Sequence, residues 1–316
     1  MRAAAGGLDR DRWRELAGLG VFGLTLPEAD GGIGLATADA VVVCEELGRA
    51  VVPGPLVASS LAAGRLDGVV DGDTVVTLAE PVPGRPTLVE HLGSADVVLV
   101  LPPTAGTPAD AGSGAGPDSV TAVDAAALRA GARSVEPLDP ATPVWLVDDL
   151  PAGDPVAGLD AATARRTGSL LTSALLVGIA EATTGMAVAY AKERTQFGRA
   201  IGSFQAVKHI VADMFARTEV ARAAAYAAGV LVDEPDQGDA ARAVAAARVM
   251  ATRAAVANGK ACIQVHGGIG FTWEADPHLF LKRAWALAPR LGSLDEAAEE
   301  VARHLVPSGG PAGDPT

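Results

Sequence analysis

The stretch from Glu193 to His209 reads ERTQFGRAIGSFQAVKH, and the stretch from Gln264 to Glu274 reads QVHGGIGFTWE. These two segments decide the fold. The first carries a cluster of cations in an otherwise acidic chain: Lys192, Arg194, Arg199 and Lys208. Arginine suits a diphosphate because its planar fork donates two hydrogen bonds at once, and glycines let a ligand approach the backbone. Taken alone, the first segment also fits a solvated helix end, and the second fits a helix C-cap with its turn.

Long helical stretches flank both segments. Small and apolar residues recur at helical spacing over 169–193, 203–232 and 239–264, which predicts an antiparallel bundle. Earlier in the chain, β-branched runs at 74–78 and 97–101, with weaker ones at 120–123 and 144–147, predict short strands. The Gly- and Pro-rich stretch 102–117 predicts a mobile loop.

The first 65 residues predict helices again. A helix is expected over 9–19, a glycine-rich loop over 26–34, a helix over 37–47 that Gly48 ends, and a short helix from Pro55. The whole pattern predicts a mainly α chain with a small β middle domain. Its parts are an N-terminal helical domain at 1–69, the β domain at 70–158, a C-terminal helical bundle at 159–306 and a disordered tail at 307–316.

Composition excludes several classes of protein. The net charge of −13 argues against a nucleic-acid binder, which needs a basic surface. Cys44 and Cys262 lie far apart without a CxxC spacing, so we expect two buried reduced thiols and no metal site. The apolar stretch from Leu170 to Tyr190 is interrupted by polar residues, which favours a buried helix over a membrane span. We expect a cytoplasmic protein.

Considered together, the two segments resemble the paired signatures of acyl-CoA dehydrogenases, an RxxFG loop followed about 70 residues later by a QxxGGxG turn. The N-terminal region, including Trp13 to Gly34 and the EELGR at 45–49, resembles the first helical domain of that family. The resemblance is weakest over 70–150. It implies a fold of N-terminal helices, a β domain and a C-terminal four-helix bundle. It also implies FAD as the cofactor and an acyl-CoA thioester as the substrate, oxidised to the 2,3-enoyl-CoA.

In this family two subunits share each FAD site. One chain supplies the flavin-ring contacts and a catalytic glutamate, and its neighbour holds the adenosine diphosphate end with the RxxFG and QxxGGxG segments. The resemblance therefore assigns six cofactor-binding residues to this chain: Arg194, Gln196, Phe197, Gln264, Gly267 and Gly268.

The other half of the site departs from the family pattern. The family's TEPxAGSD loop is reduced to the Glu-Pro pair of LAEPVPG at 78–84. The base position falls on Leu291 or Gly292, and the alternative base position of some relatives falls on Gly168. We therefore predict no catalytic residue in this chain. A displaced base stays open, and the candidate carboxylates are Glu181, Glu274, Asp276 and Asp295.

A chain that keeps one half of the FAD site and lacks the other half resembles the small subunit of heterotetrameric acyl-CoA dehydrogenases, which lacks the glutamate. That resemblance implies three partners: a second family member that carries the base, an acyl-CoA thioester and an electron-transfer acceptor. It also suggests bulky substrates such as steroid side chains. Two alternatives stay open. One is a self-sufficient dehydrogenase or related flavin monooxygenase with a relocated base, and the other is a non-catalytic scaffold subunit.

Overall fold

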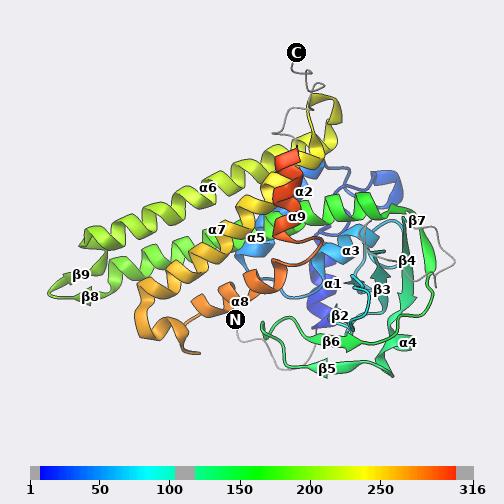
Figure 1. The fold of residues 1–316 in the computed structure, drawn as a ribbon, viewed down its shortest axis with the longest axis horizontal. Helices are drawn as coiled ribbons and strands as arrows, with labels where there is room; N and C mark the ends of the chain where they lie inside the picture. The colour runs from blue at the N-terminus through cyan, green and yellow to red at the C-terminus, as the bar shows by residue number, and fades with distance from the viewer. Residues whose placement is uncertain (1–7, 104–117, 304–316) are drawn as a thin grey trace, which may run out of the picture.

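A seven-stranded sheet lies beside one end of a helical bundle in the computed structural model, which describes residues 8–103 and 118–303 (Figure 1). The N-terminal helices are α1 (Arg10–Gly18), α2 (Thr37–Arg49) and α3 (Leu56–Ala62). The bundle is built from α5 (Ala161–Glu193), α6 (Gln205–Asp233) and α7 (Ala240–His266), followed by α8 (Pro277–Leu287) and α9 (Leu294–Arg303). The predicted fold class is confirmed.

The sheet has the strand order β5-β6-β2-β1-β3-β4-β7. Only β1 and β3 pair in parallel, and every other neighbour is antiparallel. The strands are β1 (Val76–Ala79), β2 (Thr87–Glu90), β3 (Val97–Val100), β4 (Ser119–Asp124), β5 (Arg133–Val135), β6 (Val144–Val147) and β7 (Asp154–Asp160), with the short helix α4 (Ala125–Arg129) after β4. The strands predicted at 74–78, 97–101, 120–123 and 144–147 overlap β1, β3, β4 and β6, and the sequence missed β2, β5 and β7.

Two further expectations were wrong in detail. The loop over 26–34 contains one 3-10 turn, Glu28–Asp30. The helix α2 does not end at Gly48 but continues to Arg49. A Cβ atom on Gly48 would lie 2.1 Å from the carbonyl oxygen of Leu175, so this glycine lets α2 and α5 touch and does not stop the helix.

The helix α5 begins eight residues before the predicted start at Ser169. Its N-cap is Asp160, whose side chain accepts a hydrogen bond from the N–H of Thr163 at 2.8 Å, the usual way to satisfy an orphan donor at a helix start. By length and composition α5 could cross a membrane, but 72% of its most apolar window is buried inside the fold. It is the central helix of the bundle, as the polar residues within it predicted.

The remaining predictions have mixed outcomes. Both cysteines are free and buried, and burial raises the pKa of each thiol to about 12, as expected for inert core residues. The domain limits stay predictions. Most of the expected loop at 102–117 and the tail at 307–316 lie outside the described residues.

Candidate functional site

The RxxFG segment forms a hairpin at the free end of the bundle. Arg194 follows the last residue of α5, and the two-residue strands β8 (Thr195–Gln196) and β9 (Arg199–Ala200) pair antiparallel. The turn between them holds Phe197 at φ 53° and Gly198 at φ 76°. Hairpin turns of two residues favour such left-handed positions, but a phenylalanine there is strained. Phe197 is also 91% exposed, and strain at an exposed aromatic residue points to a binding role.

The neighbouring side chains support this hairpin. The ring of Phe204 meets Phe197 edge-on at 6.1 Å, and the guanidinium of Arg199 lies 4.1 Å over the same Phe204 ring. Arg194 is different. Within the part of the chain that the structure describes, its exposed side chain has no hydrogen bond or ion pair. Its guanidinium is therefore available to an anion.

The QxxGGxG segment ends α7 and starts the 3-10 helix η4 (Gly267–Phe271). Gly267 has φ 65°, a left-handed backbone conformation that favours glycine. Contacts within this chain do not explain why residue 268 is a glycine, because a Cβ atom there would meet nothing within 4 Å. The side chain of Gln264 is exposed and has no partner among the described residues. The uncovered backbone at Gly268 and the free side-chain amide of Gln264 leave room for a second molecule to approach closely.

The structure brings the two segments to the same end of the bundle. The ring of Tyr190 on α5 stacks on His266 of α7 at 4.2 Å, and a shared apolar cluster that includes Met214 of α6 lies below. His266 also hydrogen-bonds the carbonyl of Cys262 at 2.8 Å. All six predicted cofactor-binding residues thus lie at the same end of the bundle, the end at which Figure 1 shows β8 and β9. We call this end the bundle tip and define it as the hairpin 194–200 with Gln264 and η4.

The other half of the expected site lies at the opposite end of α5. Gly168 is near the start of this helix and Arg194 follows its end. The 26 residues between them correspond to about 39 Å of helix at 1.5 Å per residue. That length exceeds an extended FAD molecule, so one cofactor cannot touch both ends of the same chain.

Both expected base positions are filled by hydrocarbon. Leu291 is 6% exposed, and a Cβ atom on Gly168 would lie 2.6 Å from its Cδ1 atom. The two positions that hold the base in different relatives therefore meet in space, and Leu291 occupies the place. Gly292 has φ 108°, which disfavours a side chain there. Of the two residues at the expected base position, Leu291 is the one whose side chain packs against Gly168.

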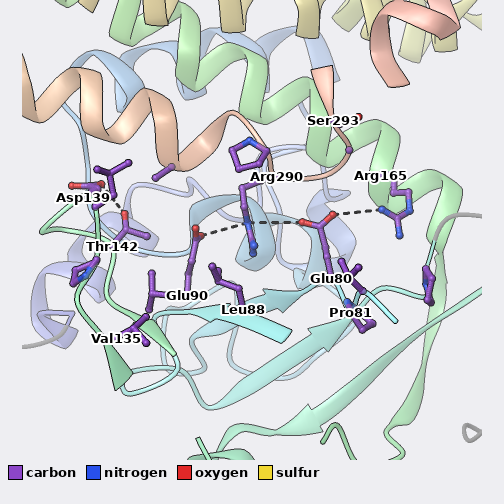
Figure 2. Close-up of a pocket in the computed structure, with 18 of the residues that line it drawn as sticks. Glu80, Pro81, Leu88, Glu90, Val135, Asp139, Thr142, Arg165, Arg290 and Ser293 are labelled. Carbon is purple, nitrogen blue, oxygen red and sulfur yellow. Dashed lines mark hydrogen bonds and ion pairs between the residues drawn. The ribbon is translucent and has the colours of Figure 1, made fainter. Parts of the chain in front are cut away.

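An internal ion-pair network closes the space next to Leu291. Arg290 lies between Glu80 and Glu90, with its Nε atom 3.8 and 3.7 Å from their carboxylates, and Arg165 lies 3.5 Å from Glu80 (Figure 2). The Nη2 atom of Arg290 donates to the carbonyl of Leu78 at 3.1 Å. We name these four side chains the charge network. Glu80 belongs to the Glu-Pro pair at 80–81, but no pattern in the sequence predicted its arginine partners.

The cavity beside the charge network is acidic. It has a volume of about 580 Å³ and lies between the sheet and the loop after α8. Five carboxylates line it (Glu80, Glu90, Glu136, Asp139 and Glu296), against two guanidinium groups (Arg165 and Arg290). A negative excess of this kind repels a diphosphate. A second cavity, beneath Leu291 and lined mainly by apolar side chains of α2, α3 and α5, measures only about 70 Å³.

The carboxylate of Glu80, the one next to Leu291, is held by contacts within the chain. The backbone N–H of Leu291 donates to both carboxylate oxygens of Glu80, at 3.0 and 3.1 Å. Arg165 and Arg290 lie beside the same carboxylate. None of the four candidate carboxylates lines either of these two cavities, but Glu181 lines a third cavity of about 550 Å³ between α5 and α6. Glu181 pairs with Arg222 at 2.8 Å, Glu274 and Asp276 lie between η4 and α8, and Asp295 lies in the first turn of α9.

Comparisons with known proteins agree with this geometry. The family models for the N-terminal and C-terminal domains of acyl-CoA dehydrogenase match residues 1–67 and 160–306. The chain is 36% identical to acyl-CoA dehydrogenase IpdE2 of Mycobacterium tuberculosis, over 95% of this chain and 86% of that protein. It is also 36% identical to FadE34 of the same organism over 89% of this chain, but it spans only 41% of FadE34.

The solved structures contain the same fold. The structure of the Tcur3481-Tcur3483 steroid ACAD variant matches with a TM-score of 0.76 and 25% identity, over 94% of this chain and 89% of that one. Sequence models, a relative of similar length and a solved structure thus lead to one family. The chain belongs to the acyl-CoA dehydrogenase family.

Proposed function

We propose that this chain is the non-catalytic subunit of a heteromeric, FAD-dependent acyl-CoA dehydrogenase. FAD is the cofactor of the family, and the steroid ACAD match is named for two unlike components. The observation that carries the proposal is the separation along α5. An exposed, unpaired bundle tip lies at one end, and a base position filled by Leu291 lies at the other.

The bundle tip is the part that holds FAD, and the FAD belongs to the neighbouring chain. Arg194 binds the diphosphate, because a guanidinium without an internal partner can donate two parallel hydrogen bonds. The exposed ring of Phe197 covers the adenine region. Gly267 and Gly268 let the cofactor approach the backbone, and the amide of Gln264 adds a hydrogen bond. FAD supplies hydride acceptance when bound, and the residues of this chain only position it.

The unlike partner chain supplies what is absent here. In this chain the cavity next to the sheet is acidic, Leu291 occupies the expected base position, and the apolar cavity beneath it is too small for an acyl chain. The partner therefore carries the catalytic glutamate and the flavin-ring contacts. The assembly oxidises an acyl-CoA thioester to the 2,3-enoyl-CoA and passes electrons to an electron-transfer acceptor. The match to a steroid ACAD favours a bulky acyl group.

The test is flavin content. Arg194→Ala in the complex of the two unlike chains should weaken FAD binding by about 1.5–3 kcal/mol, roughly 10- to 150-fold, because a charge-assisted contact is lost. The measurement is the flavin absorbance of the complex after dialysis against increasing volumes of buffer without FAD. Arg253→Ala is the matched control, because Arg253 is exposed on α7 away from the tip.

Two results would reject the proposal in different ways. Stoichiometric FAD with turnover in the isolated chain would favour a self-sufficient enzyme. A flavin content that is unchanged by Arg194→Ala and by Gln264→Ala would favour a scaffold that does not touch the cofactor.

A further inference from the structure

The cavity beside the charge network has a floor made by one face of the sheet. Glu90 of β2, Val144 of β6 and Val135 of β5 are paired directly across the three strands, so their side chains share a face. Leu88 lies two residues before Glu90 and points to the same side. All four line the cavity, and the loop between α8 and α9 lines its opposite side (Figure 2).

The cavity is apolar over much of its surface and is stiffened by prolines. Val82, Leu88 and Leu138 line it and are 53%, 40% and 54% exposed, so the fold leaves these large side chains uncovered. Five prolines also line it: Pro81, Pro83, Pro103, Pro137 and Pro289. A proline fixes its own φ angle, which helps the walls to keep their shape without a ligand. A preformed apolar surface of this kind favours a ligand with an apolar body.

Three of the five carboxylates in the cavity have cationic partners within the chain. Two of them belong to the charge network, which contains two guanidinium groups, and Asp139 pairs with Arg283. Glu136 makes no hydrogen bond or ion pair with any residue that the structure describes. Glu296 accepts a hydrogen bond from the N–H of Ser293 at 2.7 Å, but no cation pairs with it in the described part of the chain. Two negative charges therefore remain uncompensated.

These two carboxylates belong to different walls of the cavity. Glu136 directly follows β5 on the sheet side, and Glu296 lies in the first turn of α9 on the bundle side. A ligand that meets both must carry a positive charge at each end and an apolar segment between them. An anion is disfavoured, because carboxylates outnumber guanidinium groups around the cavity.

We propose that this cavity binds an aliphatic diamine, with one ammonium group at Glu136, the other at Glu296 and the methylene chain over the apolar floor. An ammonium group carries three donors and no acceptor, so it suits a single carboxylate. One exposed ion pair contributes little by itself. Two pairs joined by a chain act together, because binding of the first ammonium raises the effective concentration of the second. The cavity is separate from the bundle tip, so the proposal holds whether or not the tip binds FAD.

The experiment is isothermal titration calorimetry of the purified chain at pH 7 with three ligands of equal chain length. Octanediamine, with an amine at each end, should bind at one site per chain. Octylamine has the same apolar body and one ammonium group, and it should bind about fivefold more weakly because one ion pair is lost. Octanoate should give no saturable binding.

Two substitutions test the carboxylates. Glu136→Gln and Glu296→Gln should each lower the affinity for octanediamine about fivefold and remove most of its advantage over octylamine. A glutamine at 296 can still accept the hydrogen bond from the N–H of Ser293, so the start of α9 is preserved. Glu299→Gln is the matched control, because Glu299 is exposed on the same helix and does not line the cavity. It should leave the affinity unchanged.

Circular dichroism checks that each variant is folded. Octanoate that binds as tightly as octanediamine would overturn the proposal, and so would a wild-type chain that shows no saturable binding at millimolar octanediamine. Binding that survives both Glu136→Gln and Glu296→Gln unchanged would reject the two carboxylates as the site. An equal loss in Glu299→Gln would reject it as well, because it would reveal only a general effect of surface charge.

Discussion

Leu291 is the residue on which the proposed absence of a catalytic base in this chain depends. Its backbone lies in the left-handed region at φ 59°, a conformation that an L-residue adopts only when the surroundings hold it. Two contacts hold Leu291 in this conformation. Its N–H donates to Glu80, and its side chain packs over Gly168. The position of Leu291 is thus set by packing and by the charged groups beside it.

We therefore expect that restoring a carboxylate will not restore the enzyme. Neither Leu291→Glu nor Gly292→Glu should give the isolated chain measurable dehydrogenation, followed with a dye acceptor and an acyl-CoA. A glutamate at 291 would face the carboxylate of Glu80, and Arg290 still fills the adjacent space. Leu291→Met serves as the control for packing. Turnover above background by either glutamate variant would contradict this account.

Arg283 and Asp139 form a buried ion pair that ties α8 to the segment between β5 and β6, with side chains 9% and 4% exposed. Burial alone would raise the pKa of Asp139, but the guanidinium and hydrogen bonds from Thr142 and from the N–H of Ala141 lower it. A carboxyl whose pKa falls on folding stabilises the protein fully above the unfolded pKa of about 3.9. That contribution disappears as the pH drops toward the folded pKa.

Arg283→Met should thus lower the free energy of unfolding by about 3–5 kcal/mol at pH 7, because it leaves a buried charge without its partner. The variant should also lose less stability than wild type as the pH falls below about 4, since the guanidinium no longer lowers the pKa of Asp139. Urea titrations across this pH range measure both effects. Arg14→Met is the control, because the pair of Arg14 with Asp73 is exposed, and it should change stability little.

At the level of elements, two glycines decide how closely α2 and α5 pack. A Cβ atom on Gly178 would lie 1.9 Å from the carbonyl oxygen of Glu45, and one on Gly48 would lie 2.1 Å from that of Leu175. Both obstacles are backbone atoms, which cannot rotate away. The sequence pattern could not reveal this, because a glycine within a helical stretch looks the same whether it ends the helix or lets two helices touch.

Gly178→Ala should therefore destabilise the protein by at least about 3 kcal/mol, although alanine is the better helix former. Gly185→Ala is the matched control on the same helix. A Cβ atom there meets nothing within 4 Å, so this change should stabilise the protein by about 0.5–1 kcal/mol. Chemical denaturation midpoints measure both. Equal effects of the two substitutions would show that the α2–α5 contact does not set the stability.

The sequence predicted elements whose signals are local and missed those that depend on contacts. The long helices and the β-branched strands were predicted from spacing, and the two motif segments were predicted from their residues. The strand β7 contains Pro155 and Gly158, which weaken a strand signal, and its pairing with β4 is irregular. The charge network joins Glu80, Glu90, Arg165 and Arg290 from three distant parts of the chain, so only the folded structure could reveal it.

At the scale of the whole molecule, the two ends of α5 predict how much flavin an assembly can hold. The bundle tip of this chain can serve a cofactor seated in its unlike partner. The acidic cavity of this chain cannot accept a second one, because carboxylates outnumber guanidinium groups there and Leu291 fills the base position. A pair of identical family members would have two equivalent sites. This pair of unlike chains should have one.

The purified complex should therefore contain one FAD for each pair of unlike chains, measured as flavin absorbance after acid release and compared with the protein concentration. Adding excess FAD should not raise the ratio, because the excess of carboxylates in the cavity and the side chain of Leu291 are present at any cofactor concentration. Glu136→Gln with Glu296→Gln removes two charges from the cavity without removing Leu291 or Arg290, and the ratio should stay at one. A ratio of two in the wild-type complex would mean that this chain seats a flavin of its own.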